Sequence, residues 1–314
     1  MNQKRFITAA EAMENWRDDL FLGKPPTFFP IAERGPLSRI EVGPKLITLI
    51  GGAPGAGKTA FVMQCVVDAL RLTANLRAVV CNVEMPPEVL LDRQLSRLSG
   101  VPLEAIRYRR LESIHADRID AGLSTIESFA DRLCFVRPPF DLANVAATAD
   151  EFSPLSGGGG LLLVLDYLQR IQPPGSQSDK RGSVDLVMNY LRQFADAGAA
   201  VVVVSSVGRQ KDNRGRSTYS GDVMSLASFK ESGELEFGAD DAFILAPSAS
   251  LPGVRELKHL KARHTEPQDL LLSFDGATQG FRPYDDSEAG GRLSSALSAC
   301  WNHAESAGGE PWNP

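Results

Sequence analysis

Residues 52–59 read Gly-Ala-Pro-Gly-Ala-Gly-Lys-Thr, the complete pattern of a phosphate-binding loop. Their flanks fit this interpretation, because the apolar run 46–50 predicts a buried strand and the apolar spacing over 59–72 predicts a helix. In such a strand–loop–helix, glycines let backbone N–H groups turn inward, and the helix N-terminus adds a positive dipole. A chance glycine-rich turn would lack these flanks. The sequence therefore predicts a nucleoside-triphosphate site.

The candidate nucleotide-binding residues are contiguous. Lys58 is expected to reach the β- and γ-phosphates, and the Thr59 hydroxyl is expected to bind Mg²⁺. The full candidate set is Gly52, Ala53, Pro54, Gly55, Ala56, Gly57, Lys58, Thr59 and Ala60.

The composition is that of an ordinary soluble globular protein. The 314 residues are 43% hydrophobic and 23% charged, with a net charge of −6. Any nucleic-acid-binding surface would therefore be a local basic patch on an acidic body. The four cysteines form no C-x-x-C pair, which favours reduced thiols over disulfides or a metal site. No apolar run reaches the roughly 18–20 residues of a membrane span, and no signal peptide is recognisable. We expect a cytoplasmic protein without a membrane partner.

Short apolar runs alternate with amphipathic helices along the middle of the chain. This alternation predicts an α/β fold with a mostly parallel sheet that is covered on both faces. The last two runs flank a turn containing Pro267 and predict a β-hairpin. The expected strands are 46–50, 78–83, 133–136, 161–165, 200–205, 242–245, 255–261 and 268–274. The expected helices between them are 87–99, 142–152 and 184–197.

We divide the chain into three parts. Residues 1–36 contain a helix over 8–22, which opens with a capping box from Thr8 to Glu11, and a proline-rich linker. Residues 37–284 form the α/β domain. Residues 285–314 are rich in Ser, Gly, Ala and acidic residues, which predicts a flexible tail.

Two carboxylates follow predicted strands near the expected site. Asp166 ends the apolar run 161–165 and would hold the Mg²⁺ shell from a neighbouring strand. Glu84 ends the run 78–83 and could orient the attacking water. It could equally favour the N-terminus of the next helix. The residues alone leave both interpretations of Glu84 open.

Lys261 and Arg263 form a third candidate group. Two residues apart on a strand, they would point to the same face about 6 to 7 Å apart, a plausible spacing for contact with a phosphate. A solvated edge strand explains them as well, because lysine on an edge strand is a common protection against aggregation.

A basic segment follows the strand 200–205. Such a loop is often only solvated, but its position at the nucleotide edge of the sheet favours contact with a nucleic-acid strand. The segment carries four cations against one carboxylate, namely Arg209, Lys211, Arg214 and Arg216 against Asp212.

Taken together, these motifs resemble the RecA-like motor domain of DnaB-type replicative helicases. The similarity runs in register from about residue 36 to 284. The phosphate loop marks only the superfamily of P-loop NTPases, whereas the Asp-Tyr-Leu-Gln and Glu-Ser-Gly runs are specific to the family. The matching stretches are 52–59, Asn-Val-Glu-Met at 82–85, Leu-Asp-Tyr-Leu-Gln at 165–169, Lys-Glu-Ser-Gly-Glu-Leu-Glu at 230–236 and Lys-Ala-Arg at 261–263.

The resemblance implies an Mg²⁺-dependent ATP hydrolase in DNA replication that forms a homo-oligomeric ring, a hexamer, on single-stranded DNA. Lys58 and Glu84 would act in the chain's own site. Lys261 and Arg263 would reach the γ-phosphate bound by the adjacent subunit. A loader or primase-type protein is a candidate partner. The family would place three further residues in or beside a loop lining the DNA channel, Lys230, Glu231 and Gly233.

The sequence departs from the family pattern in three places. No N-terminal helical collar is found, and the helix 8–22 would dock on the next subunit unless Trp16 and Leu20 pack on their own domain. Ser206 stands where the family usually has a glutamine that senses the γ-phosphate, and serine is too short to span that gap. Lys230 replaces an arginine and so loses a bidentate phosphate contact.

We therefore expect a DnaB-like helicase or translocase motor. The alternative is an ATP-gated RecA-like assembly or regulatory ATPase that binds partners or DNA without unwinding, favoured by Ser206 and by the absence of a collar from the sequence. A catalytically dead binding module is a third hypothesis. The intact set of Lys58, Thr59, Glu84 and Asp166 argues against it.

Overall fold

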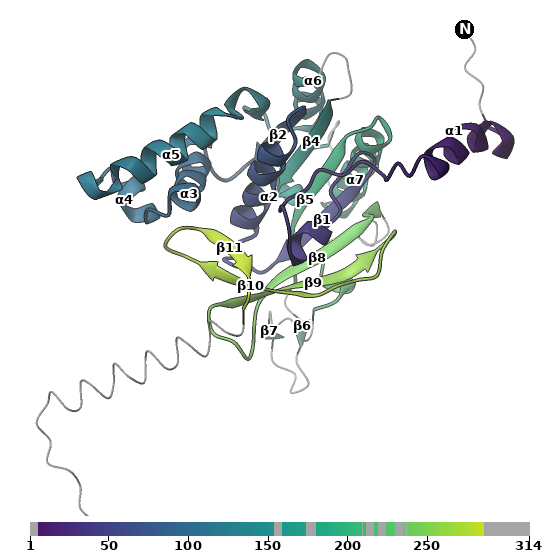
Figure 1. Cartoon of the computed structure of the whole chain (residues 1–314). Helices are drawn as coiled ribbons and strands as arrows, with labels where there is room; N and C mark the ends of the chain where they lie inside the picture. The colour runs from purple at the N-terminus through teal and green to yellow at the C-terminus, as the bar shows by residue number, and fades with distance from the viewer. Residues whose placement is uncertain are drawn as a thin grey trace, which may run out of the picture.

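Nine strands form one twisted sheet in the part of the chain that the structure describes. Their order across the sheet is β11-β10-β9-β8-β1-β5-β4-β2-β3 (Figure 1). The computed structural model describes residues 6–153, 159–173, 180–208, 210–211, 217–218, 224–229, 235 and 238–285. The strands of this sheet are β1 Ile47–Gly52, β2 Leu76–Asn82, β3 Leu133–Phe135, β4 Gly160–Asp166, β5 Ala200–Ser206, β8 Asp241–Pro247, β9 Val254–Ala262, β10 Leu270–Asp275 and β11 Gly280–Pro283.

The strands from β8 to β3 are parallel, and β9, β10 and β11 are antiparallel to their neighbours. This arrangement confirms the predicted α/β fold with its C-terminal hairpin. Parallel strands buried on both faces need continuous apolar runs, and every residue of β1 is buried. Two short strands, β6 Gln210–Lys211 and β7 Ser217–Thr218, pair separately.

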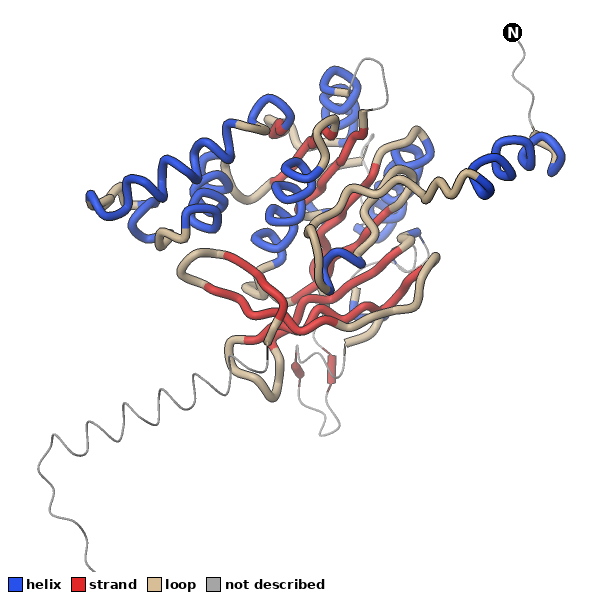
Figure 2. The backbone as a smooth tube through the Cα atoms, in the orientation of Figure 1, coloured by secondary structure: helices blue, strands red, loops and turns tan. Residues whose placement is uncertain are grey.

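The sheet separates two apolar clusters, because successive side chains of a strand point to opposite faces. Ile50 and Val80 belong to the cluster under α2, whereas Leu49 and Val79 belong to the cluster under α6 and α7. Helices therefore cover both faces, as predicted (Figure 2). The helices are α1 Ala9–Phe21, α2 Lys58–Leu72, α3 Pro87–Ser99, α4 Leu103–Arg107, α5 Ala116–Glu127, α6 Leu142–Phe152 and α7 Lys180–Asp196.

Five helices and strands of the described residues were not predicted: α4, α5, β6, β7 and β11. α4 has only five residues, and α5 buries only Ile119 and Gly122. β11 has four residues, of which only Phe281 is buried. Elements with so little buried surface carry a weak hydrophobic period, so tertiary contacts decide their structure.

The predicted N-terminal helix is present as α1, and Thr8 and Glu11 form the expected capping box. α1 projects away from the sheet (Figure 1), and its side chains Trp16 and Leu20 are exposed. They do not pack on their own domain. The linker that follows is anchored to the domain by Phe29, which is buried and lies so close to Gly160 that the glycine has no room for a Cβ. None of the helices seen in the described residues is long and apolar enough to cross a membrane.

Candidate nucleotide site

The phosphate-binding loop lies between the end of β1 and the start of α2. Gly55 and Gly57 have φ values of 75° and 99°, which L side chains rarely adopt. A Cβ on Gly52 would lie 2.6 Å from the carbonyl oxygen of Leu245, and a Cβ on Gly57 would lie 2.8 Å from the ring of Phe281. The glycines are therefore required by both backbone conformation and close packing, and the cradle fits a phosphate group approached by backbone N–H groups.

Lys58 lies at the centre of this cradle. Its Nζ donates hydrogen bonds to the carbonyl oxygens of Gly52 at 2.8 Å and Ala53 at 3.0 Å. Burial lowers the pKa of Lys58, while the negative charges of Asp166 and Glu84 oppose that shift. The ammonium group is thus held by two neutral carbonyls in a partly buried position, where an anionic ligand would be a stronger partner.

Thr59 and Asp166 meet as predicted. The Thr59 hydroxyl donates to Asp166 Oδ2 at 2.6 Å, and the Asn82 amide donates to the same oxygen at 2.8 Å. Asp166 is only 5% exposed, and burial raises its pKa, against the opposing effect of the Thr59 hydrogen bond.

These oxygens fit Mg²⁺. The ion prefers hard oxygen ligands and usually takes one or two protein groups together with substrate phosphates and waters. Thr59 and Asp166 supply that number, and the described residues hold no cluster of three or more His, Cys, Asp or Glu side chains that could bind a metal alone.

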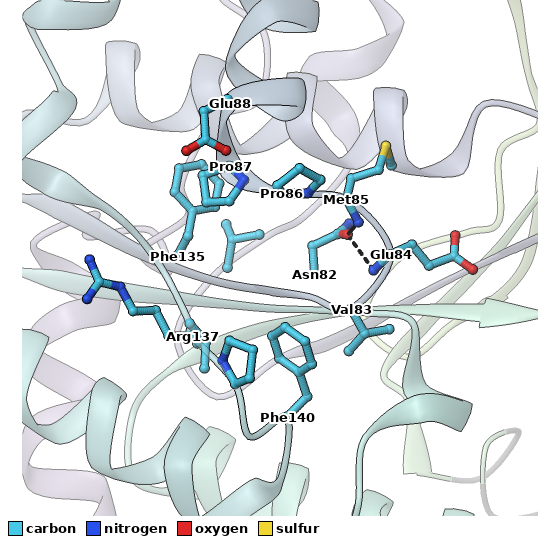
Figure 3. A pocket seen from close by; sticks show the side chains of 13 residues that line it. Asn82, Val83, Glu84, Met85, Pro86, Pro87, Glu88, Phe135, Arg137 and Phe140 are labelled. Atoms are coloured by element: carbon cyan, nitrogen blue, oxygen red, sulfur yellow. Dashed lines mark hydrogen bonds between the residues drawn. The ribbon is translucent and has the colours of Figure 1, made fainter.

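Glu84 directly follows β2 and the loop that Asn82 organises. Asn82 Oδ1 accepts hydrogen bonds from the backbone N–H groups of Glu84 at 3.0 Å and Met85 at 2.8 Å. In Figure 3 the Glu84 carboxylate points away from the apolar wall that includes Phe135 and Phe140. This wall belongs to a cavity of about 430 Å³ that Glu84 also lines. Glu84 lines a second cavity as well, the one at the phosphate-binding loop. The structure thus brings Glu84 to the loop, as the water-orienting interpretation requires.

The cavity at the phosphate-binding loop has a volume of about 650 Å³, which suits a nucleotide-sized ligand. It joins the loop to the carboxyl ends of β2, β4 and β5, as expected for an open α/β sheet. Its lining residues outside the loop are Ala60, Glu84, Arg93, Asp166, Tyr167, Ser206, Phe274 and Gln279.

Several of these residues were not identified from the sequence. Arg93 of α3 lines the cavity, and its buried Nε has no hydrogen-bond partner among the described residues. Such an orphaned donor fits a phosphate-bearing ligand. The helix 87–99 was predicted, but nothing in it separated Arg93 from Arg97, which instead pairs with Asp68 at 3.0 Å. Asn82 was part of a matching stretch, yet only the fold shows that it binds Asp166.

Ser206 ends β5 and lines the same cavity. Gln169, from the Asp-Tyr-Leu-Gln stretch, accepts a hydrogen bond from the Ser206 backbone N–H at 3.3 Å and donates to the Ser205 hydroxyl at 2.8 Å. The ends of β4 and β5 are therefore tied together beside the cavity.

Lys261 and Arg263 lie at the opposite end of the parallel strands from the phosphate-binding loop. Asp241 pairs with Thr48 and Ala262, whereas Gly52 pairs with Leu245. Thr48 and Gly52 are four residues apart on β1, a distance of about 13 Å along the strand. This distance separates Lys261 and Arg263 from the phosphate-binding loop of the same chain. β10 pairs with β9 only over Val254–Leu257, so Lys261 lies on a part of β9 that β10 does not cover, as the edge-strand interpretation expects, and Arg263 follows the last residue of β9.

The predicted DNA-contacting residues cannot be placed in the same way. The backbone of Lys211 belongs to β6, but its side chain is not described. The others lie outside the described residues, namely Arg209, Arg214, Arg216, Lys230, Glu231 and Gly233. Their role stays a prediction.

A phosphate-binding loop at the end of a central parallel strand, with Thr59 and Asp166 meeting beside it, defines a P-loop NTPase of RecA-like fold. Residues 42–283 match the family model described as "DnaB-like helicase C terminal domain". The chain belongs to this family.

Relatives and solved structures agree with that assignment. The chain is 23% identical over 257 residues to the replicative DNA helicase DnaB of Buchnera aphidicola subsp. Baizongia pistaciae, covering 78% of this chain and 53% of the relative. It is 26% identical over 202 residues to the DnaB of Pasteurella multocida, covering 63% of this chain and 41% of the relative. The chain therefore spans about half the length of these curated relatives.

Two solved structures share the fold. One, an isolated ATPase domain, superposes with a TM-score of 0.75 at 16% identity, over 88% of this chain and 99% of that one. A DnaB-like replicative helicase, studied with its interactions with primase, superposes with a TM-score of 0.76 at 17% identity, over 89% of this chain and 69% of that one.

Proposed function

We propose that this chain is the motor of a ring-forming DnaB-like DNA helicase, which hydrolyses ATP at its subunit interfaces while bound to single-stranded DNA. The observation that carries the proposal is the division of the site between two edges of one sheet. Lys58, Thr59, Glu84 and Asp166 gather at one edge, while Lys261 and Arg263 lie at the other.

In the proposed reaction, Lys58 exchanges its two carbonyl partners for the β- and γ-phosphates of ATP. Thr59 and Asp166 would hold Mg²⁺, which would supply positive charge against the negative charge that develops on the phosphates. Glu84 orients the attacking water and accepts its proton. Arg93 donates its unpartnered Nε–H to the nucleotide.

Lys261 and Arg263 complete the site of a neighbouring copy. They cannot reach their own phosphate-binding loop, but head-to-tail packing of copies brings the two edges together and closes into a ring. The hexamer follows from the resemblance. Within the ring, α1 is the docking arm, because Met13, Trp16 and Leu20 expose an apolar surface on it.

The remaining parts of the proposal concern DNA and partners. Residues 209–216 and 230–233 would follow the phosphates of a single strand in the channel. A primase-type protein is the proposed partner, since one structural relative was studied with its primase. The motor would work in the cytoplasm. Residues 1–36, 37–284 and 285–314 would serve as arm, motor and tail.

ATPase rates with and without single-stranded DNA, combined with strand displacement on a forked duplex, test the proposal. The wild-type protein should show DNA-stimulated hydrolysis and unwinding. Lys58→Ala should lose hydrolysis by about 10³-fold, because one preorganised phosphate contact is removed. Arg71→Ala, an exposed change on the same helix, is the control. Hydrolysis that ignores DNA would contradict the helicase.

The second candidate is an ATP-gated assembly ATPase that does not unwind DNA. Ser206 favours this second candidate, because it lines the cavity at the end of β5 and its side chain is too short to contact the γ-phosphate. The end of β5 would then not sense the nucleotide. DNA-stimulated hydrolysis without strand displacement, together with ATP-dependent assembly, would support this candidate over the helicase.

A further inference from the structure

Asp240 is a buried carboxylate at the edge of the sheet opposite the nucleotide cavity. It precedes β8 and is 2% exposed. Its Oδ2 accepts the backbone N–H of Ile47 at 2.8 Å, and its own N–H donates to the Ile47 carbonyl oxygen at 2.8 Å. The carboxylate is thereby fixed to the first residue of β1, the strand that leads to the phosphate-binding loop.

Two guanidinium groups converge on this carboxylate. Arg263 Nη1 lies 2.8 Å from Oδ1, and Arg192 Nη2 of α7 lies 3.1 Å from Oδ2. The Arg263 side chain is 45% exposed, so its charge remains accessible from outside. Arg192 donates a charge-assisted hydrogen bond to this carboxylate, and Arg263 forms an ion pair with it, so the carboxylate is a fixed counter-charge for both cations.

The neighbouring backbone holds the second cation. Lys261 Nζ donates to the Ala239 carbonyl oxygen at 2.7 Å, one residue before Asp240. Burial lowers the pKa of Lys261, with a further lowering from the positive charge of Arg263. One short segment, 239–240, therefore holds both cations that the proposed function assigns to a neighbouring site.

We propose that Asp240 is the positioning residue that presents Arg263 to the nucleotide of the adjacent subunit. The inference rests on the proposed function, because it needs Arg263 to act in trans. Asp240 restricts the Arg263 side chain to one direction before the subunits meet, so less side-chain entropy is lost when the phosphate contact forms. Arg192 keeps the carboxylate compensated when the Arg263 guanidinium leans toward the phosphate.

The experiment measures ATPase kcat in rings of single and mixed variants. Asp240→Asn keeps an oxygen acceptor for Ile47 but loses the charge that holds Arg263. We expect kcat to fall about tenfold, because a misplaced catalytic group costs one to two orders of magnitude. The affinity for ATP in the variant's own cavity should stay within about twofold, because that cavity lies at the opposite edge.

Mixing subunits separates a trans effect from a general loss of structure. Lys58→Ala has a dead cavity and an intact Arg263, whereas Asp240→Asn has an intact cavity and a misdirected Arg263. Mixed rings should hydrolyse ATP faster than rings of either variant alone, because some interfaces then pair an intact cavity with an intact Arg263. The reference mixture, Lys58→Ala with Arg263→Ala, tests the trans role of Arg263 without involving Asp240.

A double-mutant cycle measures whether Asp240 acts through Arg263. Asp240→Asn should add no further loss to Arg263→Ala, whereas a general destabilisation would add to it. Asp241→Asn is the matched control, because Asp241 is equally buried but accepts its hydrogen bond from His259 at 3.1 Å. Its kcat should match the wild type. If Asp240→Asn does not fold, Asp240→Glu replaces it and should show the same non-additivity, since it keeps the charge but moves the carboxylate by one methylene.

The outcomes distinguish the two proposals. If the reference mixture recovers hydrolysis while Asp240→Asn keeps wild-type kcat, or if its loss adds to that of Arg263→Ala, the positioning role is wrong and the trans role of Arg263 stands. If the reference mixture recovers nothing, the trans role is wrong, and the positioning role that rests on it falls as well.

Discussion

Asp166 and Asp240 are two buried carboxylates at opposite ends of the parallel strands of one sheet, and their partners differ. Asp166 accepts hydrogen bonds from the neutral groups of Thr59 and Asn82, and burial raises its pKa. Asp240 faces two guanidinium groups and a backbone N–H. The hydrogen-bond donors of Asp166 carry no charge, whereas two cations compensate the charge of Asp240 within the protein. The two carboxylates are similarly buried and differ in whether their partners are neutral or charged.

The largest expected effect comes from removing the compensated carboxylate. Asp240→Ala should lower the free energy of unfolding by about 2 kcal/mol, because it leaves the Ile47 N–H and two cations without their acceptor. Urea unfolding measures the change. Asp166→Ala is the matched variant and should cost clearly less, because both groups that donate hydrogen bonds to Asp166 are neutral. Equal losses would contradict the comparison.

Arg93 extends the comparison to a cation. Its buried Nε lacks a partner among the described residues, so Arg93→Met should raise the unfolding free energy of the nucleotide-free protein by about 1 kcal/mol while weakening ATP binding. Arg132→Met is the control, since Arg132 donates to the carbonyl oxygens of Thr73 and Leu76 and its loss should destabilise. Thermal melts and ATP titrations measure both effects, and a destabilised Arg93→Met would contradict the prediction.

The raised pKa of Asp166 predicts a smaller, pH-dependent effect. A carboxyl whose pKa is raised by folding stabilises the native state at low pH and loses that contribution as the pH rises from its ordinary value of 3.8 through the native pKa. Asp166→Asn cannot ionise. Its stability relative to the wild type should therefore improve as the pH rises through this range, measured by melts in the absence of nucleotide. A difference that does not vary with pH would contradict the assignment.

The smallest effect on folding is expected at α1. Trp16 is 60% exposed, so Trp16→Ser should change the unfolding free energy of the dilute protein by less than about 0.5 kcal/mol. If α1 docks on a neighbouring copy, the same change should weaken ring assembly, measured by sedimentation. Leu49→Ala in the core, at about 3 kcal/mol, is the contrasting control. Unchanged assembly would contradict the docking role.

The sequence predicted the fold well because the central parallel strands are almost entirely buried. The runs that became β1, β2, β4 and β5 are continuous and apolar, so their type could hardly be mistaken. The phosphate-binding loop was predicted in full, because the backbone conformation of the loop itself requires its glycines. The contact between Thr59 and Asp166 was predicted because both residues follow parallel strands, whose carboxyl ends lie at the same end of the sheet.

The rest of the site depends on contacts between distant segments. Arg93 became notable only because the fold left its Nε without a partner, and Asp240 only because Arg192 and Arg263 arrive from other elements. No spacing rule encodes such meetings. The position of Arg263 also departs from the prediction, because β9 ends at Ala262 and Arg263 follows the strand instead of lying on it.

The packing of Phe29 against Gly160 links the N-terminal segment to the start of β4. The arm enters the domain at Phe29, β4 begins at Gly160, and the strand ends at Asp166 after about 20 Å. A displacement of the N-terminal helix would therefore act first on the residues around Phe29, whose ring occupies the space of a Cβ on Gly160 at the start of β4, and β4 ends at Asp166.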